Sequence, residues 1–101
     1  MNDLEAEFDR DMVAVYTKAK KECSYNATRY LQMISEYGGL ATAKKLLAAE
    51  KLHEGLIALY ECGCLRLTVE VLVIEEKYRS LFTEEEIKIA EKRLRDLNYL
   101  G

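Results

Sequence analysis

Three cysteines and one histidine are the residues best suited to bind a metal ion or to attack a substrate. Cys62 and Cys64 lie two positions apart, and with Cys23 and His53 they would make four soft ligands of the kind zinc takes. The spacing differs from the paired Cys-x-x-Cys hooks of zinc sites, and Cys23 falls on an apolar stripe, where a free cysteine behaves as a small buried side chain. A Cys–His nucleophile pair would need His53 as its base, but no flanking signature supports it. We therefore expect no metal, no cofactor and no catalytic residue.

Two runs of carboxylates are the next candidates for acid–base chemistry, at residues 75–76 and 84–86. The second run follows Thr83 at the start of a predicted helix, where capping and the helix dipole account for acidic residues. Chemistry with paired carboxylates needs both groups directed into one cleft, and the spacing does not indicate this. The Gly38-Gly39 pair lacks the Lys-Ser/Thr or further glycines of a phosphate-binding loop.

Tyrosine is frequent in this chain, with seven tyrosines against two phenylalanines and no tryptophan. Tyr30 and Tyr37 share one face of a predicted helix, beside Arg29. Lys44 and Lys45 follow in the next predicted helix, after a short Gly-Gly turn that makes the two helices neighbours. These five residues could form a surface for an anionic ligand or a partner, through stacking and charge-assisted hydrogen bonds. The alternative, which we favour for the rings, places them in the core with their hydroxyls at its rim.

The size and composition of the chain predict one globular domain, residues 1–101. Its 101 residues leave room for a single core, and 50% of them are hydrophobic while 33% are charged. The acidic residues 1–11 lack the apolar segment of a secretion signal, and an odd number of cysteines favours reduced thiols, so we expect a cytoplasmic protein. No apolar run approaches the ~20 residues of a membrane-spanning helix, so we expect no membrane partner.

The charge of the chain is unevenly distributed around a net value of −3. Residues 1–16 carry five acids and one base, residues 17–55 seven bases and four acids, and residues 56–101 seven bases and nine acids. Nucleic-acid-binding domains usually present a dense Lys/Arg face. A mildly basic middle section in an acidic protein is only weak evidence for such binding, so we do not expect nucleic acid as a partner.

The absence of proline and the spacing of the apolar residues predict an all-α fold, a compact bundle of five or six short helices. The expected helices span residues 2–23, 27–37, 40–49 and 56–62, with a polar connection at residues 50–55. Gly38 and Gly63 are expected to end helices in the left-handed conformation.

The last helix has the clearest start signal. Thr83 and Glu86 have the spacing of a capping box, and Phe82 and Ile87 that of a hydrophobic staple. Segment 65–74 is ambiguous, because its apolar residues fit both strand alternation and a helical stripe. A strand needs a pairing partner, and no second strand candidate exists in the sequence, so we predict a helix there.

Six segments in order carry a family resemblance: residues 26–33 (NATRYLQM), 38–47 (GGLATAKKLL), 55–61 (GLIALYE), 65–73 (LRLTVEVLV), 81–86 (LFTEEE) and 90–94 (AEKRL). Together they resemble a widespread, functionally uncharacterised small bacterial domain that occurs alone or appended to larger proteins. The resemblance covers residues 11–99 and implies an all-helical fold.

The resemblance also implies that Arg29, Lys44 and Glu70 belong to the shared pattern, which adds Glu70 to the candidate binding residues. The chain departs from the pattern at Arg66, where aspartate is common, and at Cys62 and Cys64. The cysteine departure further lowers the expectation of a metal site. The resemblance implies no substrate, reaction or partner.

The sequence thus predicts a non-enzymatic intracellular interaction module that binds another macromolecule or itself. Self-association would add stability to a small core. The alternative is a binder of a small anionic ligand such as a nucleotide, through Arg29, Tyr30, Lys44 and Lys45. A counter-defence protein of a phage or mobile element would suit either mechanism.

Overall fold

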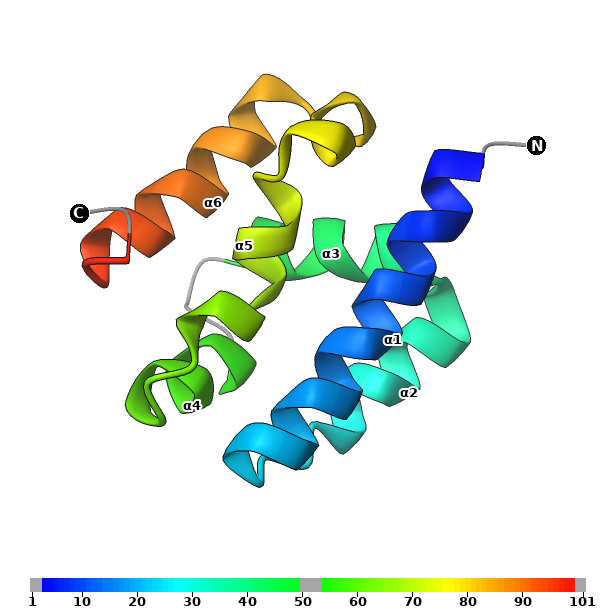
Figure 1. Cartoon of the computed structure of the whole chain (residues 1–101). Coiled ribbons are helices and arrows are strands. Elements are labelled where there is room, and N and C mark those ends of the chain that lie inside the picture. Colours follow the sequence, from blue (N-terminus) through cyan, green and yellow to red (C-terminus); the bar gives the residue numbers. More distant parts are fainter. Residues whose placement is uncertain (1–2, 50–53, 100–101) are drawn as a thin grey trace.

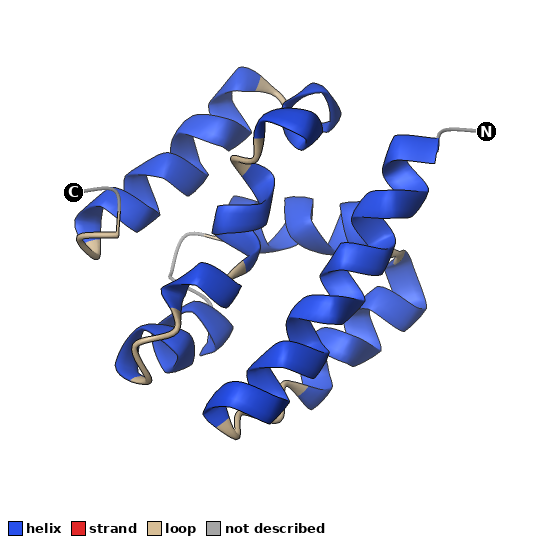
Figure 2. Cartoon of the chain, viewed as in Figure 1, coloured by secondary structure: helices blue, strands red, loops and turns tan. Residues whose placement is uncertain are grey.

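The structure, a computed structural model, describes residues 3–49 and 54–99, and every regular element in these ranges is helical (Figure 2). The predicted all-α fold is therefore confirmed. The described elements are α1 (Asp3–Cys23), α2 (Thr28–Tyr37), α3 (Gly39–Ala48), α4 (Glu54–Glu61), the 3-10 helix η1 (Leu65–Leu67), α5 (Val69–Val73), the 3-10 helix η2 (Glu76–Leu81) and α6 (Glu84–Asp96). The radius of gyration is 12.5 Å, close to the ~13 Å of a compact chain of this length.

The predicted helix boundaries agree with the structure to within one or two residues. Gly38 (φ 88°) and Gly63 (φ 73°) both have the positive φ predicted for them, which glycine adopts readily because it has no Cβ. The ψ of Gly38 is 162°, so this residue lies outside the left-handed helical region that was predicted. The polar connection predicted at residues 50–55 is too long, since Glu54 and Gly55 already belong to α4. The rest of that connection, with His53, lies outside the described residues.

The ambiguous segment 65–74 is helical, as predicted, but it is divided at Thr68 into η1 and α5. The Thr68 hydroxyl donates a hydrogen bond to the Leu65 carbonyl at 2.8 Å and accepts one from the Val71 amide at 3.4 Å. One threonine thus closes a helical turn before it and caps the helix after it. This division keeps α5 to five residues, which lie in the centre of the molecule.

The main core lies between α1, α3, α5, η2 and α6. Figure 1 shows α5 between α1 and α6, with α3 crossing behind. Both α5 and α3 pack against α1 and against α6. Phe8 of α1 is fully buried and forms edge-to-face contacts with Tyr78 and Phe82, with ring centroids 5.0 Å and 5.4 Å apart. Aromatic contacts of this geometry stabilise a core beyond the area they bury.

The start of α6 has the predicted capping box. The Thr83 hydroxyl accepts a hydrogen bond from the Glu86 amide at 3.1 Å, and the Glu86 carboxylate accepts one from the Thr83 amide at 2.8 Å. Phe82 is buried and Ile87 packs against the same core, as predicted for the staple. The start of α6 is therefore fixed by local interactions.

A buried ion pair, with the hydrogen bonds around it, joins α3, α5 and α6. Arg93 of α6 donates to Glu70 of α5 at 3.0 Å. The same guanidinium donates to three carbonyl groups at the end of α3, those of Leu46, Leu47 and Ala49, at 3.0, 3.3 and 2.9 Å. Carbonyls at the end of a helix have no partner within the helix, so Arg93 satisfies groups that would otherwise be costly to bury.

Candidate functional site

A cleft lies where the start of α2, the end of α3 and the start of α4 meet. Its volume is about 570 Å³. Three residues predicted to bind a ligand or partner, Arg29, Tyr30 and Lys45, line this cleft. The cleft is also lined by Tyr25, Asn26, Ala27, Thr28, Met33, Leu46, Ala49, Glu54 and Gly55.

The two cations of the cleft are exposed and carry few restraints. Within the described residues Arg29 makes no ion pair, so its guanidinium is available to an incoming group. Lys45 lies over the ring of Tyr37, with its Nζ 4.6 Å from the ring centroid. A cation–π contact at an exposed site contributes about 0.5–1 kcal/mol, so Lys45 is oriented but not immobilised.

Tyr30 has a structural role in addition to its place in the cleft wall. Its hydroxyl donates a hydrogen bond to the Met12 carbonyl at 2.6 Å. Burial raises the pKa of this hydroxyl above its ordinary value. Tyr30 therefore matches the alternative predicted for the tyrosines, a ring packed inside with its hydroxyl satisfied by the backbone.

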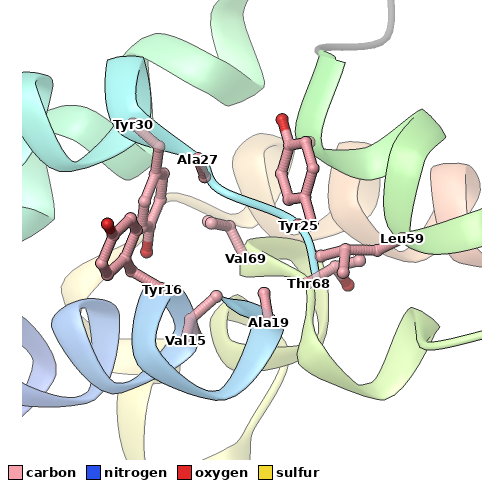
Figure 3. Close-up of a pocket in the computed structure, with 10 residues that line it drawn as sticks. Val15, Tyr16, Ala19, Tyr25, Ala27, Tyr30, Leu59, Thr68 and Val69 are labelled. Carbon is pink, nitrogen blue, oxygen red and sulfur yellow. The ribbon is translucent and has the colours of Figure 1, made fainter. Parts of the chain in front are cut away.

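A small apolar cavity lies behind the cleft and shares four lining residues with it, Tyr25, Ala27, Tyr30 and Gly55. Figure 3 shows its walls, which include the rings of Tyr16 and Tyr30 on one side and Val69, Thr68 and Leu59 on another. Its volume is about 30 Å³. A water molecule needs about 10–15 Å³ of such space, so the cavity has room for one small group.

Lys44 lies apart from the cleft. Its Nζ is 2.7 Å from the Glu86 carboxylate and 5.1 Å from the centroid of the Phe82 ring, so it links α3 to the start of α6. Partial burial opposes ionisation of Glu86, but hydrogen bonds from Lys44 and Thr83 outweigh it and lower the pKa of this carboxyl. Lys44 and Lys45 were predicted to act on one surface, and the structure places them on two.

Glu70 is fully buried, since its exposed fraction is 0%. Its carboxylate forms the ion pair with Arg93 described above. The inclusion of Glu70 among the surface binding residues is therefore wrong. Its role is to hold α5 against α6.

The structure has an exposed aromatic patch that was not predicted from the sequence. We use this name for Ile57, Tyr60, Arg66 and Tyr99. The exposed fractions of Ile57, Tyr60 and Tyr99 are 43%, 48% and 40%. Ile57 and Tyr60 lie one helical turn apart on α4, and Tyr60, Arg66 and Tyr99 line one shallow hollow of about 430 Å³.

The sequence of α4 contains a pattern that could have predicted the aromatic patch. Leu56 and Leu59 face the core, and Ile57 and Tyr60 remain outside, so this helix is apolar on both faces. A helix that is apolar all round is usually buried on all sides, and here one side is open. No comparable sequence signal marks Tyr99, because it follows the last helix. It comes next to Tyr60 and Arg66 only when the chain folds.

The prediction that all three cysteines are reduced thiols is wrong for two of them. Cys23 and Cys64 form a disulfide, and Cys62 is a free and exposed thiol. Cys23 and Cys64 adjoin a small second core with Ala19, Leu59 and Leu67. Among residues 3–49 and 54–99, no cluster of three or more His, Cys, Asp or Glu side chains is arranged to hold a metal ion.

Comparison with known protein families, with curated proteins and with solved structures gives no significant match for this chain. The resemblance to a widespread bacterial domain therefore stays a prediction. Among the described helices, none combines the length and the apolar character that crossing a membrane requires.

Proposed function

We propose that this protein is a non-enzymatic interaction module, which binds another protein or a second copy of itself through the aromatic patch. The observation that supports this most strongly is the open apolar side of α4. Ile57 and Tyr60 are both more than a third exposed, and the patch continues onto Tyr99 across one hollow. Burying such side chains against a partner would release water from apolar area.

The composition of the aromatic patch also fits a protein interface. Tyrosine and arginine are enriched among the residues that contribute most to protein–protein affinity. Arg66 forms an ion pair with Glu22 on one side and reaches the hollow on the other. The patch therefore combines the apolar area of Ile57 and two aromatic rings with two hydroxyls and a guanidinium, a mixture that protein interfaces also present.

Site-specific cross-linking in the cells that produce the protein tests this proposal. Tyr60 is replaced by the photoreactive p-benzoylphenylalanine, which keeps an aromatic ring at the centre of the patch. Tyr37 is the matched control position, because it is a tyrosine with the same exposed fraction of 48% on a different surface. We expect discrete adducts from position 60 and none from position 37.

The mass of the adduct distinguishes a second copy of the chain from a different protein. The absence of adducts at position 60, or equal adducts at both positions, would contradict the proposal. A Tyr99→Ala substitution in the same experiment should reduce the adduct, since Tyr99 lines the same hollow.

A second candidate function is the binding of a small anionic ligand, such as a nucleotide, in the cleft. It is supported by Arg29 and Lys45, which line one cleft of about 570 Å³. A charge-assisted hydrogen bond contributes about 1.5–3 kcal/mol, so two cations on one anionic group would give measurable affinity.

Thermal unfolding with a panel of nucleotides tests this second candidate. A ligand at about a hundred times its dissociation constant stabilises by about 2.7 kcal/mol, which raises the Tm of a ~100-residue domain by about ten degrees or more. The rise should disappear in Arg29→Ala and persist in Lys88→Ala, a lysine of α6 outside the cleft. If no nucleotide raises the Tm of the wild type, the second candidate is wrong.

A further inference from the structure

All three cysteines of the chain meet at one place, although they come from distant parts of the sequence. The Cys23–Cys64 disulfide joins the last residue of α1 to the residue before η1, across a sequence separation of 41 residues. The third cysteine, Cys62, lies two residues from Cys64. Its sulfur is 4.0 Å from the carbonyl oxygen of Cys23, so its side chain lies against the partner of Cys64.

We propose that the three cysteines form a thiol–disulfide exchange site, in which Cys62 and Cys64 alternate as the partner of Cys23. A disulfide with a free thiol beside it can rearrange without any further reagent. In this chain the free thiol is exposed and lies next to Cys23.

The exchange balances within the chain. Cys62 gives its proton to solvent, and the resulting thiolate attacks the sulfur of Cys23. A bond forms between Cys62 and Cys23, and the bond between Cys23 and Cys64 breaks. The electron pair of the broken bond stays on Cys64, which takes up a proton. No net oxidation or reduction occurs.

The backbone between the two alternating cysteines permits this change. Gly63 lies between them with φ 73°, a conformation that glycine adopts at no steric cost. A Cβ at this position would meet no atom within 4 Å, so the turn has open space around it. No neighbouring atom therefore blocks a change of backbone conformation at Gly63 on the side where a Cβ would lie.

The surroundings of Cys64 suit both states of its sulfur. Its exposed fraction is 7%, and it packs with Ala19, Leu59 and Leu67. A free cysteine in such a setting behaves as a small hydrophobic side chain. Release of Cys64 from the disulfide therefore leaves a thiol where a thiol is well tolerated.

The exchange site adjoins the aromatic patch. The Cys62 amide donates to the Ala58 carbonyl, and the Gly63 amide donates to the carbonyl of Tyr60, so the cysteine turn is bonded directly to α4. A switch of partner from Cys64 to Cys62 would move the end of α4 and, with it, Tyr60. Exchange of the disulfide would thus alter the surface to which we assign partner binding.

Peptide mapping of the wild-type protein tests the exchange. The purified protein is kept without reductant, its free thiols are blocked with N-ethylmaleimide, and tryptic peptides are sequenced by mass spectrometry. Trypsin cleaves after lysine and arginine. Cys23 therefore falls in the peptide of residues 22–29, and Cys62 and Cys64 fall together in the peptide of residues 52–66. We expect two forms of the peptide that contains Cys62 and Cys64, one blocked at Cys62 and one blocked at Cys64. Cys23 should be unblocked in both.

This pattern excludes simple reduction, because reduction would leave Cys23 free for blocking as well. Blocking at Cys62 alone would overturn the proposal. So would blocking of Cys64 only in molecules in which Cys23 is also blocked.

A pair of variants gives a second, independent test. In Cys64→Ser, treatment with oxidised glutathione should remove both remaining thiols and link the peptides of Cys23 and Cys62. In Cys62→Ser, the matched control, the same treatment should give the Cys23–Cys64 link. Circular dichroism establishes that each variant keeps its helical content. A folded Cys64→Ser protein that fails to form the new link would overturn the proposal.

Discussion

Replacement of Arg93 by alanine is the change to which the fold should be most sensitive. The guanidinium is buried, donates to the Glu70 carboxylate, and donates to three carbonyls at the end of α3. Removing one member of a buried ion pair costs about 3–5 kcal/mol, because the other charge stays in a poorly solvated place. The free energy of unfolding of a domain is only about 5–15 kcal/mol, so the loss is a large fraction of the total.

Urea denaturation followed by circular dichroism measures this loss. For a ~100-residue domain, about 3 kcal/mol corresponds to a fall in Tm of about 12 degrees or more, so thermal unfolding gives a second reading. Arg95→Ala is the matched control, since Arg95 is an exposed arginine on the same helix and should change stability by about 0.5 kcal/mol at most. A loss below about 1 kcal/mol for Arg93→Ala would refute the assignment of a structural role to this ion pair.

Three further predictions follow from the packing and capping of the helices. Thr83→Ala should reduce the free energy of unfolding by about 1 kcal/mol in urea denaturation, because it removes the cap of α6. Gly39→Ala should reduce it by about 1–3 kcal/mol, because the added Cβ would lie 2.9 Å from the Cα of Asp9, which belongs to the backbone of α1 and cannot move aside. The pKa of Glu86 is lowered in the fold, so its contribution to stability is present above its ordinary pKa of 4.5 and is lost as the pH falls through the lower folded value. Glu86→Gln should therefore flatten the acid side of a stability-against-pH curve measured from pH 7 to pH 3.

The helices could be predicted from the sequence because their ends are determined by local chemistry. The capping box at Thr83 and the positive-φ glycines at positions 38 and 63 depend on interactions within a few residues. Segment 65–74 could be assigned as helix because a lone strand has no partner. Its division at Thr68 was not predicted, since a threonine in an apolar run gives no sign of which carbonyl its hydroxyl will bond.

The candidate site was predicted only in part, because surfaces depend on contacts between distant residues. Lys44 and Lys45 are adjacent in sequence, and adjacent residues on a helix point in different directions, so they face α6 and Tyr37 respectively. The partner of Glu70 is Arg93, 23 residues away, and no local pattern connects them.

The measurement that tests the central claim most directly is a titration of the protein against the partner recovered by cross-linking, or against itself if the adduct is a dimer. Wild type, Tyr60→Ala and Tyr37→Ala are compared by isothermal titration calorimetry or, for self-association, by sedimentation equilibrium. Loss of a tyrosine at the centre of an interface costs about 1.4 kcal/mol or more, so Tyr60→Ala should weaken binding tenfold or more. Tyr37→Ala removes an equally exposed ring from another surface and should leave the affinity unchanged. Equal affinities for Tyr60→Ala and wild type would contradict an interface at the aromatic patch, and a loss confined to Tyr37→Ala would move the interface to the side of α2.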